Sequence, residues 1–276
     1  MTESPWKVIV DGDHLTISSD AFTFTTTGTD PTRLEGVIAD LQSALRGTYG
    51  QFCGVSMAAE MVGERWGFHI IRDLITGPKS VAELSVGLPR LSLTLLSKRL
   101  KELEFVGVVR QIDADTATDT SAEGHERYEL TEYGRAAEGA VLEFGRWGAL
   151  ALAIPRHDDI VTESSLLVAL KATFLPDVAG DARLDYELHI GGRVVNARIR
   201  EGVLEVAPGP LPGADAILDL GSVLLALWTG KVTAAEVLAT GQVLVDGDPA
   251  LLNRFVEMFQ LPRLPAPERA TPKVPA

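Results

Sequence analysis

The feature that most constrains this 276-residue chain is a leucine-rich segment, residues 91–104, which reads LSLTLLSKRLKELE. Four leucines recur at intervals of three and four residues, which places them on one face of an α-helix: Leu93, Leu96, Leu100 and Leu103. The opposite side carries small polar and basic side chains and one leucine: Thr94, Leu95, Lys98 and Lys101. A helix of this kind fits the major groove of DNA, so a DNA-binding regulator is the leading interpretation.

The net charge of the chain, −13, opposes that interpretation, because a phosphate backbone attracts cations. Residues 50–154 carry 11 basic and 15 acidic side chains, so the segment around the helix is acidic too. Its cations gather locally, at Lys98, Arg99, Lys101 and Arg110. We therefore expect DNA binding to depend on a small basic surface and not on bulk attraction.

Length and composition allow more than one domain, each with a substantial core, since 46% of the residues are hydrophobic. The apolar runs are too short to span a membrane, and the first residues lack the basic-then-apolar pattern of a signal peptide. Cys53 is the one cysteine, so no disulfide can form within the chain. We expect a cytoplasmic protein without membrane contact.

Periodicity and turn signals predict an N-terminal extension, residues 1–48, with short strands and a helix from Asp30 to Gly47. Residues 49–154 form the next domain. Its expected helices are 53–64, with Val55 facing inward, then 65–76, a third starting at a Ser80–Glu83 capping box, and the helix that Ser92 caps. Strands 108–112 and 128–130 and a single helix 132–150 follow. Helices followed by a β-hairpin are typical of a winged helix-turn-helix.

Residues 49–150 also resemble the HxlR family of bacterial winged-helix regulators. The matching stretches are YGQFCGVSMAAE (49–60), GERWG (63–67), IRDL (71–74), LSLTLLSKRLKELE (91–104), YELTEYGR (128–135) and RWG (146–148). The resemblance implies a homodimer that binds palindromic double-stranded DNA. It places Ser92, Thr94, Ser97, Lys98 and Arg99 on the recognition helix.

The complete set of candidate DNA contacts adds neighbours on that helix and two cations at the base of the wing: Ser92, Thr94, Leu95, Ser97, Lys98, Arg99, Lys101, Arg110 and Arg127. Lys98 would touch phosphate or a base edge, and Leu95 could pack on a thymine methyl group. The wing departs from the family pattern, because residues 113–126 hold five acidic side chains and no Lys or Arg. Either the wing is lifted off the DNA or binding is weakened.

Residues 155–261 are expected to form a second domain after a linker at Pro155, and the proline-rich tail 262–276 is expected to be extended or disordered. Predicted helices are 163–175, 221–229, 233–239 and 248–259. Predicted strands are 184–190, 194–200, 203–206, 216–220 and 242–245. Glycine turns after two of the strands favour an antiparallel sheet, so the fold class of the whole chain is α+β.

Residues 162–260 resemble the sterol carrier protein type 2 fold, through AILDL (216–220), LWTGK (227–231), GQVLVDGD (241–248) and the apolar residues 251–259. The resemblance implies an α/β sandwich around an apolar tunnel for lipid-like small molecules. Candidate lining residues are Leu224, Leu227, Trp228, Val237, Leu238, Phe255, Met258 and Phe259. The alternative is a closed core that these side chains fill.

Other chemistry is not indicated. The five histidines are dispersed without ligand spacing, no cofactor motif or catalytic constellation stands out, and the chain is not expected to be an enzyme. Cys53 fits a redox sensor less well than a small buried residue. The sequence thus predicts a dimeric regulator that responds to an apolar ligand. The alternative is a protein that binds or sequesters a small molecule and has lost DNA binding.

Overall fold

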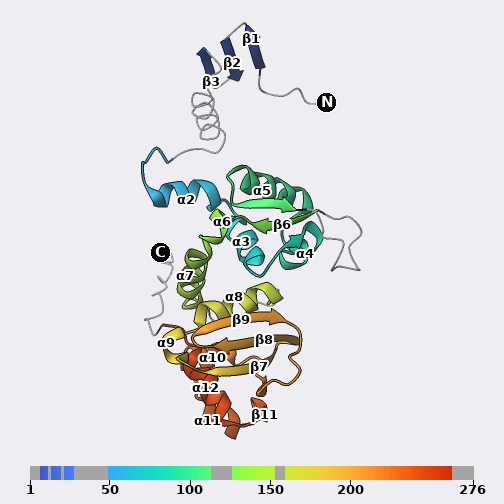
Figure 1. Cartoon of the computed structure of the whole chain (residues 1–276), viewed down its shortest axis with the longest axis vertical. Coiled ribbons are helices and arrows are strands. Elements are labelled where there is room, and N and C mark those ends of the chain that lie inside the picture. The colour runs from blue at the N-terminus through green and yellow to red at the C-terminus, as the bar shows by residue number, and fades with distance from the viewer. Residues whose placement is uncertain are drawn as a thin grey trace, which may run out of the picture. The chain divides into compact units, whose positions relative to one another are not determined.

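The computed structural model describes residues 7–11, 14–19, 22–27, 49–112, 126–152 and 159–262. They form two compact units, residues 1–64 and 65–276 (Figure 1). The predictions for the helix 30–47, the wing tip 113–125, the linker at Pro155 and the tail from residue 263 lie outside the described residues.

The first unit contains a three-stranded antiparallel sheet in the order β1-β2-β3, followed by helix α2. The elements are β1 (Lys7–Asp11), β2 (His14–Ser19), β3 (Phe22–Thr27) and α2 (Gly54–Val62). Asp11 pairs with His14, so β1 and β2 form a hairpin, which confirms the short strands predicted for this segment. In α2 the buried residues are Ser56 and Val62, whereas Val55 is 78% exposed, so its predicted inward orientation is wrong.

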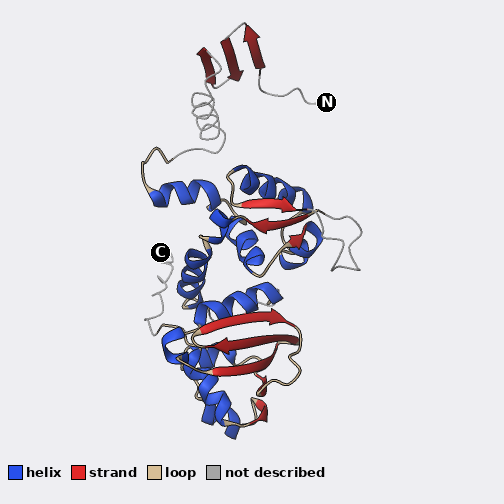
Figure 2. Ribbon diagram, in the orientation of Figure 1, coloured by secondary structure: helices blue, strands red, loops and turns tan. Residues whose placement is uncertain are grey.

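The second unit begins with helices and a small antiparallel sheet in the order β4-β6-β5 (Figure 2). Its elements are α3 (Gly67–Ile75), β4 (Lys79–Ser80), α4 (Val81–Gly87), α5 (Leu93–Phe105), β5 (Val109–Ile112), β6 (Arg127–Leu130), α6 (Glu132–Arg135) and α7 (Glu138–Ala149). The capping box is confirmed: Ser80 accepts from the backbone N–H of Glu83, whose carboxylate accepts from the N–H of Ser80. The structure has the helix order and hairpin of a winged helix-turn-helix.

The single helix predicted over residues 132–150 is two helices, α6 and α7. The start of α6 is held next to β5, because the hydroxyl of its N-cap residue, Thr131, donates to the carbonyl of Gly107 at 2.6 Å. Gly134 lies so close to the sheet that a Cβ atom there would be 2.0 Å from the carbonyl oxygen of Val108. The chain then forms a turn at residues 136–137 before α7 begins.

The remainder of the second unit is a five-stranded sheet with helices. The elements are α8 (Glu163–Thr173), α9 (Pro176–Ala179), β7 (Arg183–Ile190), β8 (Arg193–Arg200), β9 (Val203–Pro208), β10 (Ala216–Asp219), α10 (Leu224–Trp228), α11 (Ala234–Ala239), β11 (Leu244–Gly247) and α12 (Ala250–Met258). The α+β fold class is confirmed. An isolated bridge between Phe174 and Phe259 joins the first and last helical segments.

The sheet order is β11-β10-β7-β8-β9, and the predicted antiparallel pairing is wrong at one place, where β10 runs parallel to β7. The reason is the segment after β9, which crosses the sheet before entering β10. This segment is held over β7 by Glu187, whose carboxylate accepts from the backbone N–H of Leu211 at 2.7 Å. Asn196 of β8 fixes the same segment by donating to the carbonyl of Gly209.

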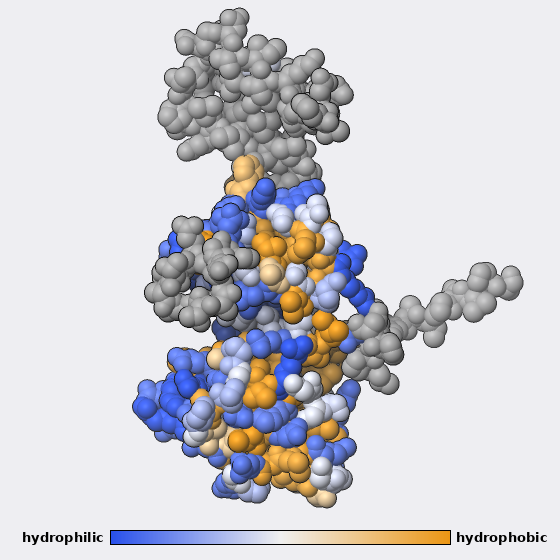
Figure 3. Space-filling model, turned by 90° about the vertical axis from the view of Figure 1, so that its right-hand side faces the viewer, coloured by the Kyte–Doolittle hydropathy of each residue, from blue (hydrophilic) through white to orange (hydrophobic). Residues whose placement is uncertain are grey.

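Alternate side chains of the central strands form the core of this domain, facing α8, α10 and α12: Tyr186, Leu188, Val195, Ala197 and Ile199. The face in Figure 3 mixes apolar and hydrophilic residues over the described surface, so hydropathy alone does not mark a functional surface there. Among the described residues, no helix is long and apolar enough to cross a membrane.

Candidate nucleic-acid interface

Helix α5 is the predicted recognition helix, and its start is fixed by Ser92, whose hydroxyl accepts from the backbone N–H of Leu95 at 3.3 Å. Leu96, Leu100 and Leu103 are buried, as predicted. Leu93 is 58% exposed, so its predicted inward orientation is wrong. Leu91, just before the cap, is buried instead.

The outer face of α5 presents the polar and basic side chains that the periodicity predicted. Thr94, Ser97, Lys98 and Lys101 are exposed, and Leu95 is half-buried. The ammonium of Lys98 is 3.8 Å from the Glu102 carboxylate, and the Lys98 side chain is 66% exposed. A contact this long at the surface holds the side chain weakly, so Lys98 can turn to a phosphate.

Arg99 has a different environment from the lysines. Its side chain is only 16% exposed, and its guanidinium pairs with Glu102 on the next turn of the helix. The arrangement fixes Arg99 along the side of α5 and away from the outer face. Arg99 is therefore poorly placed to contact DNA.

The two cations at the base of the wing also have partners within the protein. Arg110 of β5 pairs with Glu129 of β6, with 2.7 Å between Nε and the carboxylate oxygen, and remains 60% exposed. Arg127 donates to the carbonyl of Pro78 at 2.8 Å and pairs with Glu83 at 3.1 Å. Arg127 thus ties the wing to the start of α4, and its side chain is only 20% exposed.

Arg90 is a cation near the recognition helix that was not predicted from the sequence as a DNA contact. Arg90 is exposed two residues before the N-cap of α5. A basic residue just before the N-terminus of a recognition helix lies where the helix meets the DNA backbone. Its closeness to the Ser92 cap was the signal that could have identified it.

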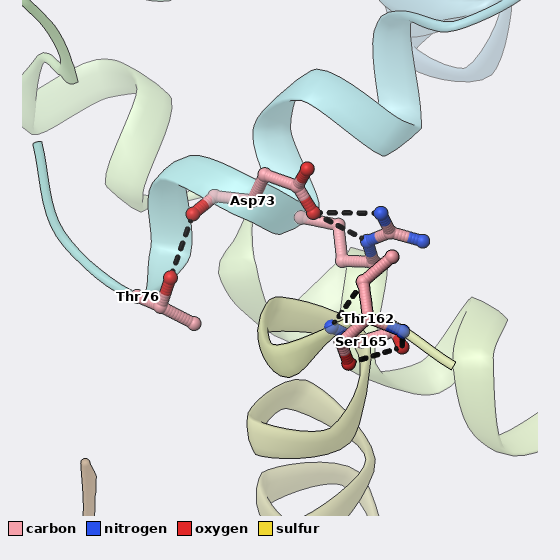
Figure 4. Close-up of polar contacts among 5 residues, drawn as sticks. Asp73, Thr76, Thr162 and Ser165 are labelled. Atoms are coloured by element: carbon pink, nitrogen blue, oxygen red, sulfur yellow. Dashed lines mark hydrogen bonds and ion pairs between the residues drawn. The ribbon is translucent and has the colours of Figure 1, made fainter. Parts of the chain in front are cut away.

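A buried carboxylate supports the helices beneath α5. Asp73 of α3 is 1% exposed, and Arg72 donates to its Oδ1 from Nε at 2.8 Å. Its Oδ2 has no hydrogen-bond partner among the described residues. Burial raises the pKa of Asp73, while Arg72 opposes that shift. The backbone carbonyl of Asp73 accepts from the Thr76 hydroxyl, and the Asp73 carboxylate points toward Arg72 (Figure 4).

The predicted pocket residues come together in the core of the C-terminal domain. All but Leu238, which is half-buried, are buried there: Leu224, Leu227, Trp228, Val237, Phe255, Met258 and Phe259. The Phe255 and Phe259 rings stack with 4.5 Å between centroids. The indole Nε1 of Trp228 is buried without a hydrogen-bond partner among the described residues.

Cys53 is exposed at the N-cap of α2, so the expectation that it is a small buried residue is wrong. The backbone N–H groups of Ser56 and Val55 at the start of α2 lower the pKa of its thiol. Elsewhere in the described ranges, no three His, Cys, Asp or Glu side chains converge as a metal site would require.

Comparison with known proteins identifies the DNA-binding part. The model of the HxlR-like helix-turn-helix family matches residues 61–154. The uncharacterised HTH-type transcriptional regulator YvaP of Bacillus subtilis (strain 168) is 36% identical over 90 residues, which are 33% of this chain and 79% of that protein. The HTH-type transcriptional regulator YodB of the same organism is 35% identical over 91 residues, 33% of this chain and 76% of YodB.

Among solved structures, a putative HTH-type transcriptional regulator, ytcD, is 32% identical and covers 36% of this chain and 95% of its own, with a TM-score of 0.31. The matched residues contain α3, α4, α5 and both wing strands. This chain belongs to the HxlR-like helix-turn-helix family of transcriptional regulators.

Proposed function

We propose that this protein is a dimeric transcriptional regulator that binds palindromic operator DNA and responds to an apolar small molecule in its C-terminal domain. The observation that carries the proposal is the outer face of α5. It presents Thr94, Ser97, Lys98 and Lys101 to solvent on a helix whose opposite side is buried. Short hydroxyl side chains and two lysines on one exposed helix face suit base edges and phosphates.

The proposed contact set is smaller than the sequence suggested. It contains Ser92, Thr94, Leu95, Ser97, Lys98, Lys101 and Arg90, because Arg99 and Arg127 are largely buried and have protein partners. Arg110 could join it only by exchanging Glu129 for a phosphate. Few phosphate contacts per subunit make a dimer important, because two recognition helices double them.

Dimer formation is supported by an exposed aromatic surface on α7. Phe144 and Trp147 are 58% and 68% exposed, and their rings lie 5.7 Å apart. Phe68 of α3 extends this surface by stacking on Phe144 at 5.2 Å. Exposed aromatic clusters of this kind mark interaction surfaces. A second copy of the chain is the partner that the proposal assigns to it.

Ligand binding by the C-terminal domain is supported by the resemblance to the sterol-carrier fold and by two features of the core. The predicted lining residues share one apolar cluster. The buried indole N–H of Trp228 lacks an acceptor among the described residues, and buried polar groups usually have one. A mainly apolar ligand with one hydrogen-bond acceptor would satisfy it. Such a ligand can regulate DNA binding only if it prefers one arrangement of the dimer.

The proposal is tested by binding the full chain to DNA from the region that flanks its gene, over a range of salt concentrations. A regulator gives a protected footprint with inverted-repeat symmetry and a measurable salt slope. Native mass spectrometry of protein purified from its own host tests the ligand, which would appear as a retained mass. A chain that protects no DNA at low salt is not an operator-binding protein.

The second candidate function, a small-molecule binding protein without DNA binding, is favoured by the ion pairs of Arg110 and Arg127. These pairs engage the cations at the base of the wing in a chain of net charge −13. The same experiments separate the two functions. The second candidate predicts a retained ligand with no footprint and no salt slope.

A further inference from the structure

Helix α8 is buried on two opposite sides, which is unusual for a helix at the edge of a domain. One side carries Leu166, Leu167 and Leu170, which belong to the core of the C-terminal domain. The other side is a stripe at intervals of four residues, Ser164, Val168 and Ala172, exposed by only 7%, 5% and 4%. A second buried side requires a second partner.

The second partner is the DNA-binding part of the same unit. Helices α3 and α7 both pack against α8. The small side chains of the stripe permit this close approach of helices. Figure 4 shows α8 and α3 in one view, with the capping residues Thr162 and Ser165 at the start of α8 and with Asp73 and Thr76 on α3. Helix α8 is therefore part of two packed assemblies at once.

The C-terminal end of α8 is capped from the DNA-binding part. The last carbonyls of a helix lack donors within it, and they carry the negative end of the helix dipole. The carbonyl of Leu170 accepts from the N–H of Phe174, and that of Thr173 from the N–H of Gln260. The carbonyl of Ala172 instead accepts from the Arg146 guanidinium of α7, at 2.7 Å from Nε.

An ion pair lies beside this cap. The ammonium of Lys171, in the last turn of α8, is 2.7 Å from the carboxylate of Glu138, in the first turn of α7. The two side chains are 27% and 33% exposed, so the pair is partly shielded from solvent. Each charge also has the sign that its own helix terminus favours.

We infer that α8 couples the C-terminal domain rigidly to the DNA-binding domain, with Arg146 and the Glu138–Lys171 pair as positioning residues. Domains joined in one chain usually move relative to each other, unless their interface is well packed. Here a rearrangement of the C-terminal core that moves α8 must also move α7 and α3. The regulatory meaning of this coupling rests on the proposed function, but the coupling itself does not.

Hydrogen–deuterium exchange of the full chain, followed by mass spectrometry of peptides, tests the coupling. Two variants weaken it, Arg146→Ala and Lys171→Glu. We expect exchange in α7 and α8 to be about tenfold faster in each, the change expected from losing one charge-assisted contact. Peptides from α5 and β8 should exchange as in the wild type, because their own domains remain folded. Arg146→Lys, which keeps a cationic donor, should retain most of the protection.

Two further variants make the result specific. Exchanging the charges, with Glu138→Lys and Lys171→Glu together, should restore part of the protection that Lys171→Glu alone removes, because the ion pair is remade although each charge then opposes its helix dipole. The matched control is Arg183→Glu, which breaks the exposed pair between the start of β7 and Glu201 in the β8–β9 turn and should leave α7 unchanged.

Unchanged exchange in α7 and α8 in both weakening variants would overturn the inference. Equal acceleration in α5 and β8 would overturn it as well, because the residues would then support stability in general. A wild-type protein without a footprint on DNA would reject the proposed function and leave the exchange result standing.

Discussion

Gly87 leaves room for the buried carboxylate of Asp73: a Cβ atom at Gly87 would lie 2.4 Å from Oδ2. The glycine ends α4, and the carboxylate belongs to α3, so the contact sets how closely these two helices approach. Helix α5 packs on both of them. The position of the recognition helix therefore depends on a residue without a side chain at the end of the preceding helix, α4.

Replacing Gly87 should test this relationship. We expect Gly87→Ala to lower the free energy of unfolding by about 1–2 kcal/mol, because the Asp73 side chain is held by Arg72 and cannot easily move. Urea denaturation measures the change. Gly139→Ala in α7 is the matched control, since a Cβ there meets nothing within 4 Å. Gly87→Ala in an Asp73→Ala background should cost less, and equal costs in both backgrounds would refute the steric argument.

The pH dependence of stability should report the same carboxylate. Burial raises the pKa of Asp73 in the folded state, so the folded protein binds more protons than the unfolded chain in the window above pH ~4. Stability is therefore lost as pH rises from that value through the raised pKa. Urea unfolding of wild type and Asp73→Asn between pH 4 and 7 should show the wild type weakening relative to the variant. Parallel curves would mean that Asp73 has an ordinary pKa.

The lysines of α5 should account for much of the salt dependence of DNA binding. We expect Lys98→Ala and Lys101→Ala each to reduce the slope of log affinity against log salt by about 1. Together they should weaken binding by about tenfold at physiological salt. Fluorescence anisotropy with a labelled operator fragment provides the measurement. Arg193→Ala in β8 is the control. An identical salt slope in all variants would mean that DNA binds to a surface other than α5.

Charge on the exposed aromatic surface of α7 should prevent dimer formation. Trp147→Glu places a carboxylate on the aromatic cluster that we propose is buried against a second copy of the chain. We expect the dissociation constant of the dimer to rise by at least about tenfold. Analytical ultracentrifugation measures it. Leu244→Glu, which changes a similarly exposed apolar residue in β11, should leave the dimer intact. A dimer that survives Trp147→Glu would move the interface to another surface.

The Cys53 thiol should react faster in the folded protein than in the unfolded chain. Backbone N–H groups of Ser56 and Val55 stabilise its thiolate and lower its pKa, so more thiolate is present at neutral pH. Alkylation by iodoacetamide at a pH of about 7.5, in buffer and in about 8 M urea, compares the two states. This pH lies below the usual thiol pKa of ~8.5, so a lowered pKa increases the amount of reactive thiolate. Cys53→Ser should show no labelling. A slower folded-state reaction would contradict the lowered pKa.

Local signals in the sequence predicted local structure well. The Ser80–Glu83 box and the Ser92 cap involve side chains within three residues of their backbone partners, so a short pattern contains all the information. The same holds for the buried leucines of α5 from Leu96 onward. The orientation of Leu93 was predicted wrongly because periodicity identifies the apolar face of a helix but not which residues of that face the neighbouring elements cover.

Contacts between distant residues were not predictable in this way. The parallel pairing of β10 with β7 depends on where the chain crosses the sheet, and no local pattern encodes it. Asp73 looks like an ordinary surface acid beside Arg72, and only the packing of α3 on α4 and α8 explains its burial. The sequence shows that Arg99 and Glu102 are three residues apart and can pair. It does not show whether Arg99 pairs with Glu102 or points outward, because the helix permits both orientations.

The bridge between Phe174 and Phe259 has a consequence for synthesis of the chain. The first helix of the C-terminal domain depends on residues made some eighty-five positions later. While the ribosome is still extending this domain, the leucines of α8 have no core to enter, although α3 and α7 are already complete. During synthesis, the folded DNA-binding part is therefore attached to an apolar helix that is not yet buried. A chain truncated before Phe259 would keep that apolar surface exposed, as a site for aggregation or degradation.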